Sequence, residues 1–414
     1  MLIQIWTLAA ILCLQPAPEA ASSAASAPAS VAKELSPAEV AARSGVELCL
    51  RGLEHAALQG DKAGWLAGVD HTDPEFAKEQ TYFANDLTKK RPEALALSVD
   101  GLTIADGSAR GKLTFTWTMP GKRERRVAFA AGFVERDGTW LYAGEGWERH
   151  EAPGVIVLHD PGLGELAART VEAFESVRGK VEAGFELGDS ALSKHTQKIK
   201  LYGSMKHLQQ SICLSYEDGL EGWNEPDESV KLLANKSSSV ASLRPLLAHE
   251  YGHVATFALG PQANEMPWWI EEGVAELSRE GAVGGDLPDR TVKAWAEADS
   301  LAKWDDLADF DNCPPKFHPY VYVQGHHMLG YISEQFGRHA RNRWLTLMAQ
   351  GKKLDEATRE AFGRSFSQLD AEWRVTLPRA VVKPLEPTEK VPPREPGTVP
   401  VPGLDHPAPD EVPK

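Results

Sequence analysis

Cysteine is scarce in this 414-residue chain, and the spacing of its cysteines argues against a zinc site built from thiolates. The four are Cys13, Cys49, Cys213 and Cys313, and none belongs to a Cys-x-x-Cys pair. Because Cys13 lies in an apolar amino-terminal run, the other three allow at most one disulfide within a monomer. We expect them to be small core residues, and the sequence leaves their disulfide state open.

Basic side chains are fewer than acidic ones. The chain has 44 Lys and Arg against 59 Asp and Glu, which gives a formal net charge of −15. A nucleic-acid-binding surface needs a basic patch, so this balance argues against a nucleic-acid partner. A hydrophobic content of 42% with 25% charged residues is ordinary for a globular protein, and the length predicts two or three domains.

Long apolar runs are absent after residue 14. No later segment is apolar enough to cross a bilayer, and the first 14 residues are too few for an ordinary spanning helix. Pro, Ala and Ser follow them, which predicts a signal peptide over 1–20 and a secreted, periplasmic or cell-envelope location. Residues 21–36 and the proline-rich tail 384–414 are predicted to be disordered, and the tail can associate with a cell envelope or a partner.

Residues 37–150 carry helical patterns followed by strand patterns. Apolar residues recur at helical spacing over 37–69 and 74–90. Four runs of β-forming residues separated by turn residues then predict an antiparallel meander, with strands at 95–105, 109–119, 124–135 and 139–149. We therefore predict an α+β accessory domain, which resembles the cone-shaped nuclear-transport-factor-2-like folds.

A second domain is expected over 154–380. Buried strands are predicted at 154–159, 198–201 and 230–234, with a helix over 163–185. Helical patterns return from residue 291 and predict a closing helical subdomain. The fold class is therefore α+β in both parts of the chain.

One short motif in the second domain carries chemistry. His249-Glu250-Tyr251-Gly252-His253 places two histidines four residues apart, on the same face of a helix. Two such imidazoles can hold one zinc ion, with Glu250 placed between them as a general base. Leucines at helical spacing and the Gly260-Pro261 stop support the helix. Because the chain has thirteen histidines, the motif can also arise by chance from two core histidines. A third ligand is therefore needed to distinguish a zinc site from core packing.

Glu272 is the candidate third ligand, after eighteen intervening residues. It lies in the stretch Trp-Trp-Ile-Glu-Glu-Gly-Val-Ala-Glu at 268–276, which predicts a second helix from Pro267 to Gly281. At this point the chain resembles the gluzincin metallopeptidases, and most closely the compact peptidase MA-like domains.

The resemblance implies roles for particular residues. His249, His253 and Glu272 would bind one zinc ion and Glu250 would be the catalytic base. Glu276 follows one helical turn after Glu272, where the family can have a carboxylate that orients a histidine ligand.

A tyrosine completes the set that the resemblance implies. The start of the Tyr322-Val-Gln-Gly325 helix resembles the aminopeptidase helix whose tyrosine hydroxyl stabilises the tetrahedral intermediate, although Tyr320 is an alternative match. Both also fit core packing. The amine-binding element of the aminopeptidases is not evident, which leaves endo- and exopeptidase action open.

The sequence thus predicts a zinc metallopeptidase with a peptide or protein substrate. The alternative is a catalytically idle zinc-binding scaffold or binding module, against which the intact Glu250 argues, because a pure ligand set does not need that carboxylate. A peptidase that processes itself or one partner protein is a further alternative. Cleavage specificity, the role of the first domain and the oligomeric state stay open.

Overall fold

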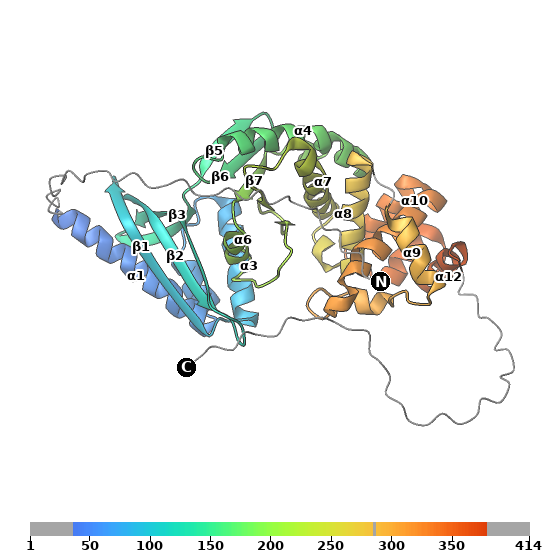
Figure 1. Cartoon of the computed structure of the whole chain (residues 1–414), viewed down its shortest axis with the longest axis horizontal. Coiled ribbons are helices and arrows are strands. Elements are labelled where there is room, and N and C mark those ends of the chain that lie inside the picture. The colour runs from blue at the N-terminus through green and yellow to red at the C-terminus, as the bar shows by residue number, and fades with distance from the viewer. Residues whose placement is uncertain (1–35, 285–286, 379–414) are drawn as a thin grey trace, which may run out of the picture.

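The structure is a computed structural model that describes residues 36–284 and 287–378. The signal peptide expected over 1–20, nearly all of the 21–36 linker and the 384–414 tail lie outside the described residues. The fold is α+β, as the sequence predicted, with one antiparallel sheet and one mixed sheet. Figure 1 shows an arch: the antiparallel sheet and its helices form one limb, and a helical layer forms the other.

The first limb contains three helices and a four-stranded meander. Its elements are α1 (Pro37–Gln59), α2 (Lys62–Ala67), α3 (Pro74–Lys89), β1 (Ala94–Ala105), β2 (Ser108–Thr118), β3 (Arg125–Arg136) and β4 (Thr139–Glu145). Neighbouring strands pair antiparallel in the order β1-β2-β3-β4. The inward side chains of the strands, such as Leu113, Phe115 and Trp117, pack with α1 and α3 into one core.

The second sheet is mixed. It contains β5 (Glu148–Ala152), β6 (Val155–His159), β7 (Gln197–Tyr202), β8 (Gly222–Trp223) and β9 (Val230–Leu233) in the order β5-β6-β7-β9-β8. The three central strands are parallel and the two edge strands are antiparallel to their neighbours. The strand predicted over 139–149 is in fact two: β4 ends after Gly144, whose φ of 93° departs from strand geometry, and β5 begins the second sheet.

Helices form the rest of the second core. They are α4 (Gly164–Phe185), α5 (Ala191–Lys194), α6 (Met205–Ser211), α7 (Val240–Phe257), α8 (Trp268–Val283), α9 (Leu287–Glu297), α10 (His318–Ala349), α11 (Leu354–Phe362) and α12 (Phe366–Thr376). Three fully buried tryptophans, Trp269, Trp344 and Trp373, anchor this core. Gly337, with φ of 82°, forms a kink inside α10. Within the described residues, no helix combines the length and apolarity that a membrane span requires.

Buried ion pairs hold α3 against the second sheet. Lys200 Nζ on β7 lies 2.6 Å from Glu79 Oε2 on α3 and 3.6 Å from Glu145 Oε2 at the end of β4. The Ser229 hydroxyl donates a hydrogen bond to the other oxygen of Glu79. Because these groups are almost fully buried, removing one partner would leave an uncompensated charge. The contact therefore fixes α3 beside the second part of the chain.

The three cysteines in the described residues are free thiols. Cys49 and Cys313 are buried and Cys213 is half-buried, which agrees with core packing. Burial raises the pKa of the Cys49 thiol to about 11, so it stays protonated at neutral pH.

Candidate metal centre

Helix α7 presents His249 and His253 to a cleft because its other face is apolar. Ser239 caps its first turn: the Ser239 hydroxyl accepts a hydrogen bond from the Ser242 amide at 3.1 Å. Leu243, Leu247 and Tyr251 are buried against the core. The Tyr251 hydroxyl donates to Glu182 on α4. This packing fixes the rotation of α7 about its axis.

Helix α8 begins and ends slightly later than the sequence predicted. Pro267 is the capping residue before the helix and not its first residue, and the helix passes through Gly281 to Val283. Gly284, with φ of 81°, ends it. Gly281 makes no close contact and lies in an ordinary helical turn, so nothing stops the helix there. These shifts leave Glu272 in the second turn, facing α7.

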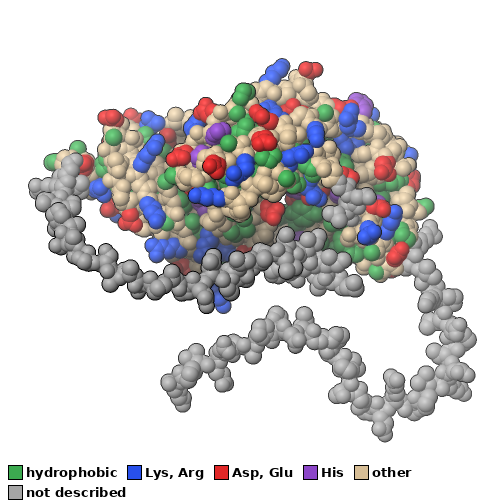
Figure 2. Space-filling model, turned by 45° about the horizontal axis from the view of Figure 1, so that its top comes forward, with side chains coloured by type: hydrophobic (Ala, Val, Ile, Leu, Met, Phe, Trp, Pro, Cys, Tyr) green, Lys and Arg blue, Asp and Glu red, His purple; other side chains and the backbone are tan. Residues whose placement is uncertain are grey.

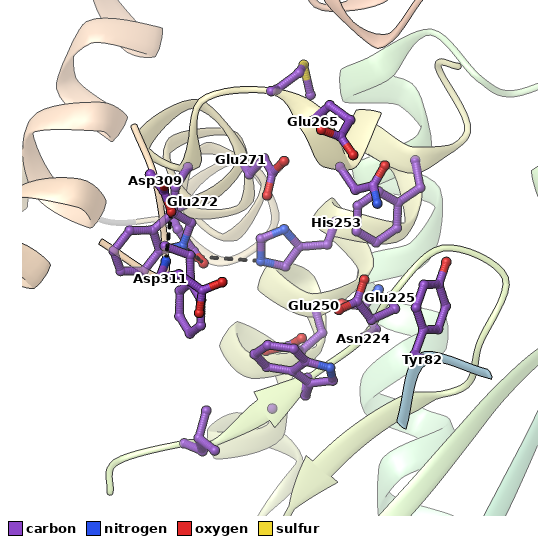
Figure 3. A pocket seen from close by; sticks show the side chains of 18 of the residues that line it. Tyr82, Asn224, Glu225, Glu250, His253, Glu265, Glu271, Glu272, Asp309 and Asp311 are labelled. Atoms are coloured by element: carbon purple, nitrogen blue, oxygen red, sulfur yellow. Dashed lines mark hydrogen bonds and ion pairs between the residues drawn. The ribbon is translucent and has the colours of Figure 1, made fainter. Parts of the chain in front are cut away.

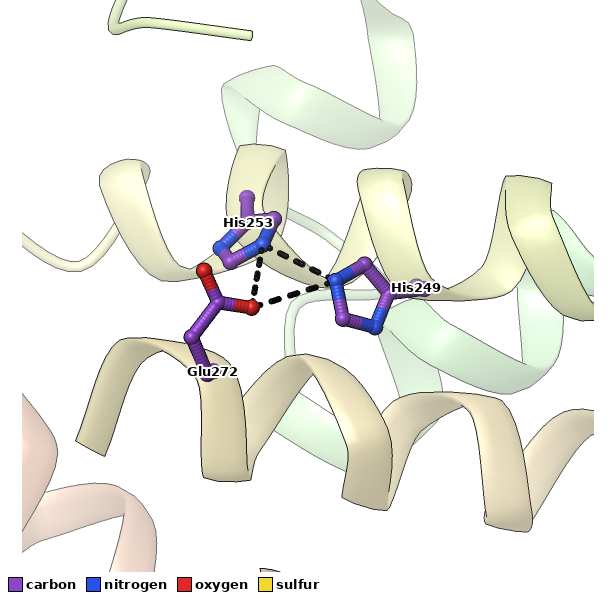
Figure 4. A group of neighbouring side chains, drawn as sticks. All are labelled: His249, His253 and Glu272. Carbon is purple, nitrogen blue, oxygen red and sulfur yellow. Dashed lines mark hydrogen bonds and ion pairs between the residues drawn. The ribbon is translucent and has the colours of Figure 1, made fainter. Parts of the chain in front are cut away.

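The three predicted ligand residues converge, as Figure 4 shows. His249 Nε2 lies 3.3 Å from His253 Nε2 and 3.3 Å from Glu272 Oε2, and His253 Nε2 lies 3.5 Å from the same oxygen. Donor atoms about 2.0–2.1 Å from a tetrahedral zinc ion are about 3.3–3.4 Å apart. Glu272 Oε2 is also buried without a hydrogen bond. Two imidazole nitrogens and one carboxylate oxygen therefore fit a single zinc ion.

Side chains around the ligands orient them. Glu276 Oε1 lies 3.1 Å from His249 Nδ1, and Arg279 Nε donates to Glu276 Oε2 at 2.8 Å. In the neutral imidazole that a metal requires, Glu276 would hold the Nδ1 proton and so leave the Nε2 lone pair facing the other ligand atoms. Trp268 Nε1 donates to Glu272 Oε1 at 2.9 Å, which turns Oε2 toward the histidines. Glu276 thus lies beside His249, where the resemblance implied. Trp268 and Arg279 are two further side chains that contact the candidate ligands or Glu276.

The charges of the two histidines and of Glu272 and Glu276 stabilise one another in the buried site. Burial alone would lower the pKa of His249, but Glu272 and Glu276 outweigh it and raise the pKa to about 10. Burial favours the neutral form of Glu272, yet the two histidines hold its pKa below the ordinary value. The carboxylate is therefore ionised at neutral pH, as a metal ligand must be.

Glu250 faces the same cleft and is nearly buried. It is 5% exposed, and burial raises its pKa despite the two neighbouring histidines. The backbone of β8 passes directly over its carboxylate: a Cβ added at Gly222 would overlap Glu250 Oε1. Because glycine lacks that atom, the strand can lie against the carboxylate without displacing it.

This contact gives a test of how Glu250 is positioned. We expect Gly222→Ala to fold and to retain zinc, because the added methyl meets the flexible end of Glu250 and not a ligand. For a site that uses Glu250 as its catalytic base, peptide hydrolysis should fall by about tenfold or more in kcat, since small misplacements of a catalytic group cost up to about 100-fold. The same substitution at exposed Gly179, which has open space around it, is the matched control. Unchanged turnover in Gly222→Ala would contradict this role of the strand.

Two glycines bring Tyr322 to the centre. Helices α8 and α10 cross where Gly273 meets Gly325, and a Cβ on Gly273 would lie 2.7 Å from the Gly325 carbonyl carbon. The ring of Tyr322, one turn before Gly325, is 6.3 Å from the ring of His249 and lines the cleft. Tyr320 instead stacks on Trp295 at 4.0 Å. Of the two candidate tyrosines, Tyr322 is the one beside the predicted ligands.

The cleft has a volume of about 770 Å³ and receives residues from both limbs of the arch. Tyr82 and Asp86 on α3 line it, and so do Asp309 and Asp311. Figure 3 shows Tyr82 and Asp309 on opposite sides of the cleft. Figure 3 shows Asn224 and Glu225, which follow β8, between α3 and His253. The Tyr82 hydroxyl donates to the Pro226 carbonyl at 3.1 Å and so ties this loop to α3.

Sequence reasoning missed these walls. Helix α3 lies more than 150 residues before the histidine motif, and nothing in its amphipathic pattern shows which element it faces. The two-residue β8 is too short to give a strand pattern, and it occupies the edge of the sheet beside β9. Glu271 also lines the cleft, and its adjacency to Glu272 in the sequence was the one signal that could have pointed to it.

Two further histidines lie outside the centre. His326 Nε2 contacts Glu280 at 2.7 Å, and His327 accepts a hydrogen bond from Trp373 at 2.9 Å. Both lie among the helices of the second core and neither belongs to the group of converging ligand atoms. They are satisfied by protein partners, as expected for structural histidines.

Comparison with known proteins identified no relative among protein-family models or curated proteins.

Proposed function

We propose that the protein is a zinc-dependent peptidase of the gluzincin type. The observation that carries the proposal is the convergence of His249, His253 and Glu272 in one cleft with an unliganded, nearly buried carboxylate, Glu250, between the two histidines in sequence. Three protein ligands leave a coordination position open, whereas structural zinc sites are usually four-coordinate and closed. Glu250 is then available for proton transfer.

Each residue of the proposed centre would have its own role in hydrolysis. A zinc ion held here would lower the pKa of a water toward about 7 and act as a Lewis acid. Glu250 takes a proton from the attacking water and delivers it to the amine that leaves. Burial moves the pKa of Glu250 upward, which is the direction that suits a base that must both accept and return a proton. Glu276 and Trp268 keep the ligands oriented.

The cleft suits an extended chain. Strand β8 is the outer strand of its sheet and lines the cleft at Gly222 and Trp223. An edge strand can pair with an extended peptide through main-chain hydrogen bonds. Strand β8 also covers Glu250. A peptide paired with β8 would therefore place one of its backbone carbonyl groups beside Glu250.

Tyr322 is proposed to donate its hydroxyl proton to the carbonyl oxygen as charge develops on it. Burial and nearby Glu272 raise its pKa well above the ordinary value, so it remains a donor at neutral pH. Tyr322→Phe should retain zinc and lose roughly 2.7–4 kcal/mol of transition-state stabilisation, which is about 100- to 1,000-fold in kcat. Tyr320→Phe should leave kcat unchanged. A loss in Tyr320→Phe and not in Tyr322→Phe would reverse the assignment.

We further propose that 37–150 is an accessory domain and 154–380 the peptidase domain, in a secreted or cell-envelope protein. Two separate sheets and two hydrophobic cores support the division, with the boundary nearer Gly146, because β5 pairs in the second sheet. The accessory domain would contribute a wall of the substrate cleft through α3.

The deciding experiment measures metal and activity on one sample. We expect the purified full-length protein to contain one zinc ion per chain and to cleave a diverse peptide library. A chelator should abolish cleavage, and added zinc should restore it. A protein with one zinc ion that cleaves neither the library nor unfolded proteins would favour the idle scaffold.

A further inference from the structure

Acidic side chains are concentrated in the cleft. Lys89 is the one lysine or arginine among its lining residues. Eight carboxylate side chains line it: Asp86, Glu225, Glu250, Glu265, Glu271, Glu272, Asp309 and Asp311. On the molecular face in Figure 2, by contrast, acidic and basic side chains are interspersed. The lining of the cleft is therefore more one-sidedly acidic than that face.

Five of these carboxylates already have a role or a partner. Glu272 and Glu250 belong to the proposed metal centre. Asp86 lies 3.5 Å from Lys89, and Asp311 lies 2.7 Å from Lys90. Asp309 accepts hydrogen bonds from Asn312 and from the Asp311 amide.

The other three carboxyl groups have no side-chain partner in the described part of the chain: Glu225, Glu265 and Glu271. Figure 3 shows them around the ring of His253. They come from three different segments, the loop after β8, the turn before α8 and α8 itself. Among the residues that the structure describes, no lysine or arginine forms an ion pair with any of the three.

Glu271 is the most informative of the three. Its side chain is half-buried, it lines the cleft, and its Oε1 has neither solvent contact nor a hydrogen-bond donor. The side-chain nitrogen and oxygen of Asn224, in the same cleft, are also buried and unpaired. Native structures contain few buried polar groups of this kind, and leaving one unpaired costs about 1–3 kcal/mol. A substrate group that donates hydrogen bonds would satisfy them.

The charge decides which donor fits. A neutral hydroxyl or amide would pair one oxygen and supply no counter-charge to the cluster, and an acidic side chain would add to its negative charge. A lysine ammonium or an arginine guanidinium supplies several donors and the missing positive charge. Resting on the proposed peptidase function, we propose that the cleft around Glu225, Glu265 and Glu271 binds a basic side chain of the substrate next to the cleaved bond.

The test compares peptides that differ in one residue. Amino-terminally acetylated, carboxy-terminally amidated peptides carry Lys, norleucine or Glu at each of three positions on either side of a fixed cleavage site. With the zinc-loaded full-length protein, Lys at one position should raise kcat/KM at least about tenfold over norleucine, because a site with unpaired polar groups rejects an apolar analogue. Glu there should lower it, and high salt should shrink the preference for Lys.

Variants locate the subsite. Glu271→Gln and Glu225→Gln should each reduce the Lys-to-norleucine ratio of kcat/KM by about tenfold, with zinc content as the check on Glu271→Gln. Glu175→Gln, which removes an exposed carboxylate on α4, should leave the ratio unchanged. An unacetylated peptide without Lys tests whether the free amino terminus of the substrate, and not a side chain, supplies the positive charge. If only the free amino terminus increases cleavage, the side-chain assignment is wrong.

The outcomes separate this inference from the proposed function. Cleavage of all acetylated peptides at equal rates would overturn the inference and keep the peptidase. If the parent cleaves none, fluorescence polarisation of labelled Lys and norleucine peptides decides. Tighter binding of the Lys peptide, lost in Glu271→Gln, would keep a cation-binding cleft without peptidase activity, and equal binding would overturn it.

Discussion

Glu250→Gln is expected to bind one zinc ion per chain, to fold like the parent and to lose nearly all peptide hydrolysis. Glutamine keeps the size and hydrogen-bonding capacity of the side chain but cannot accept the proton. General bases contribute on the order of 10²- to 10⁴-fold to a rate, so kcat should fall by about that factor. Zinc content by mass spectrometry, the melting temperature and kcat on one good peptide substrate measure the three expectations together.

The environment of Glu250 strengthens this test. The residue is 5% exposed, and none of the described basic side chains forms an ion pair with it, so the glutamine leaves no partner unpaired. Its pKa is raised by burial, which means that the neutral isostere removes a desolvated charge and should not destabilise the fold. Glu175→Gln is the matched control and should behave as the parent. A Glu250→Gln protein that cleaves as fast as the parent would contradict the mechanism.

Local signals explain why much of the centre could be predicted from the sequence. The spacing of His249 and His253 fixes their shared face, because helical geometry is the same in every protein. The four-strand meander was predicted within one or two residues at most ends, since turn residues such as Asp137-Gly138 separate the strands. The α+β class followed from these two local patterns. The zinc and peptidase assignments came from resemblance and stay predictions.

The remaining features depend on contacts between distant segments. The placement of α3 in the cleft rests on Lys200 and Glu79, which are 121 residues apart and look like ordinary surface charges in the sequence. Gly222 shows its importance only once β8 is seen against Glu250. The break between β4 and β5 was missed because the residues on both sides of Gly146 favour strands, and only the fold divides them between two sheets. Tertiary packing thus decided what propensity could not.

The identity of the third ligand gives the last expected result, and two adjacent residues test it. Consecutive helical residues point about 100° apart, so only one of Glu271 and Glu272 can face the histidines. Glu272 Oε2 lies within 3.5 Å of both Nε2 atoms, whereas Glu271 is not part of the converging group. Glu272→Gln replaces a charged ligand by a weak neutral one and removes the counter-charge of both histidines.

We therefore expect Glu272→Gln to bind zinc at least about 100-fold more weakly than the parent, since loss of an outer partner alone costs roughly 10- to 100-fold. Peptide hydrolysis should disappear with the metal, as it should in His253→Ala. Glu271→Gln should retain one zinc ion per chain, which makes it the matched control for the same chemical change one residue away. Zinc affinity by competition with a chromophoric chelator measures all three variants. Retention of zinc in Glu272→Gln together with its loss in Glu271→Gln would assign the ligand role to Glu271. In that case Glu271 would not be free to bind a substrate side chain, and the proposed subsite for a basic side chain would lose one of its carboxyl groups.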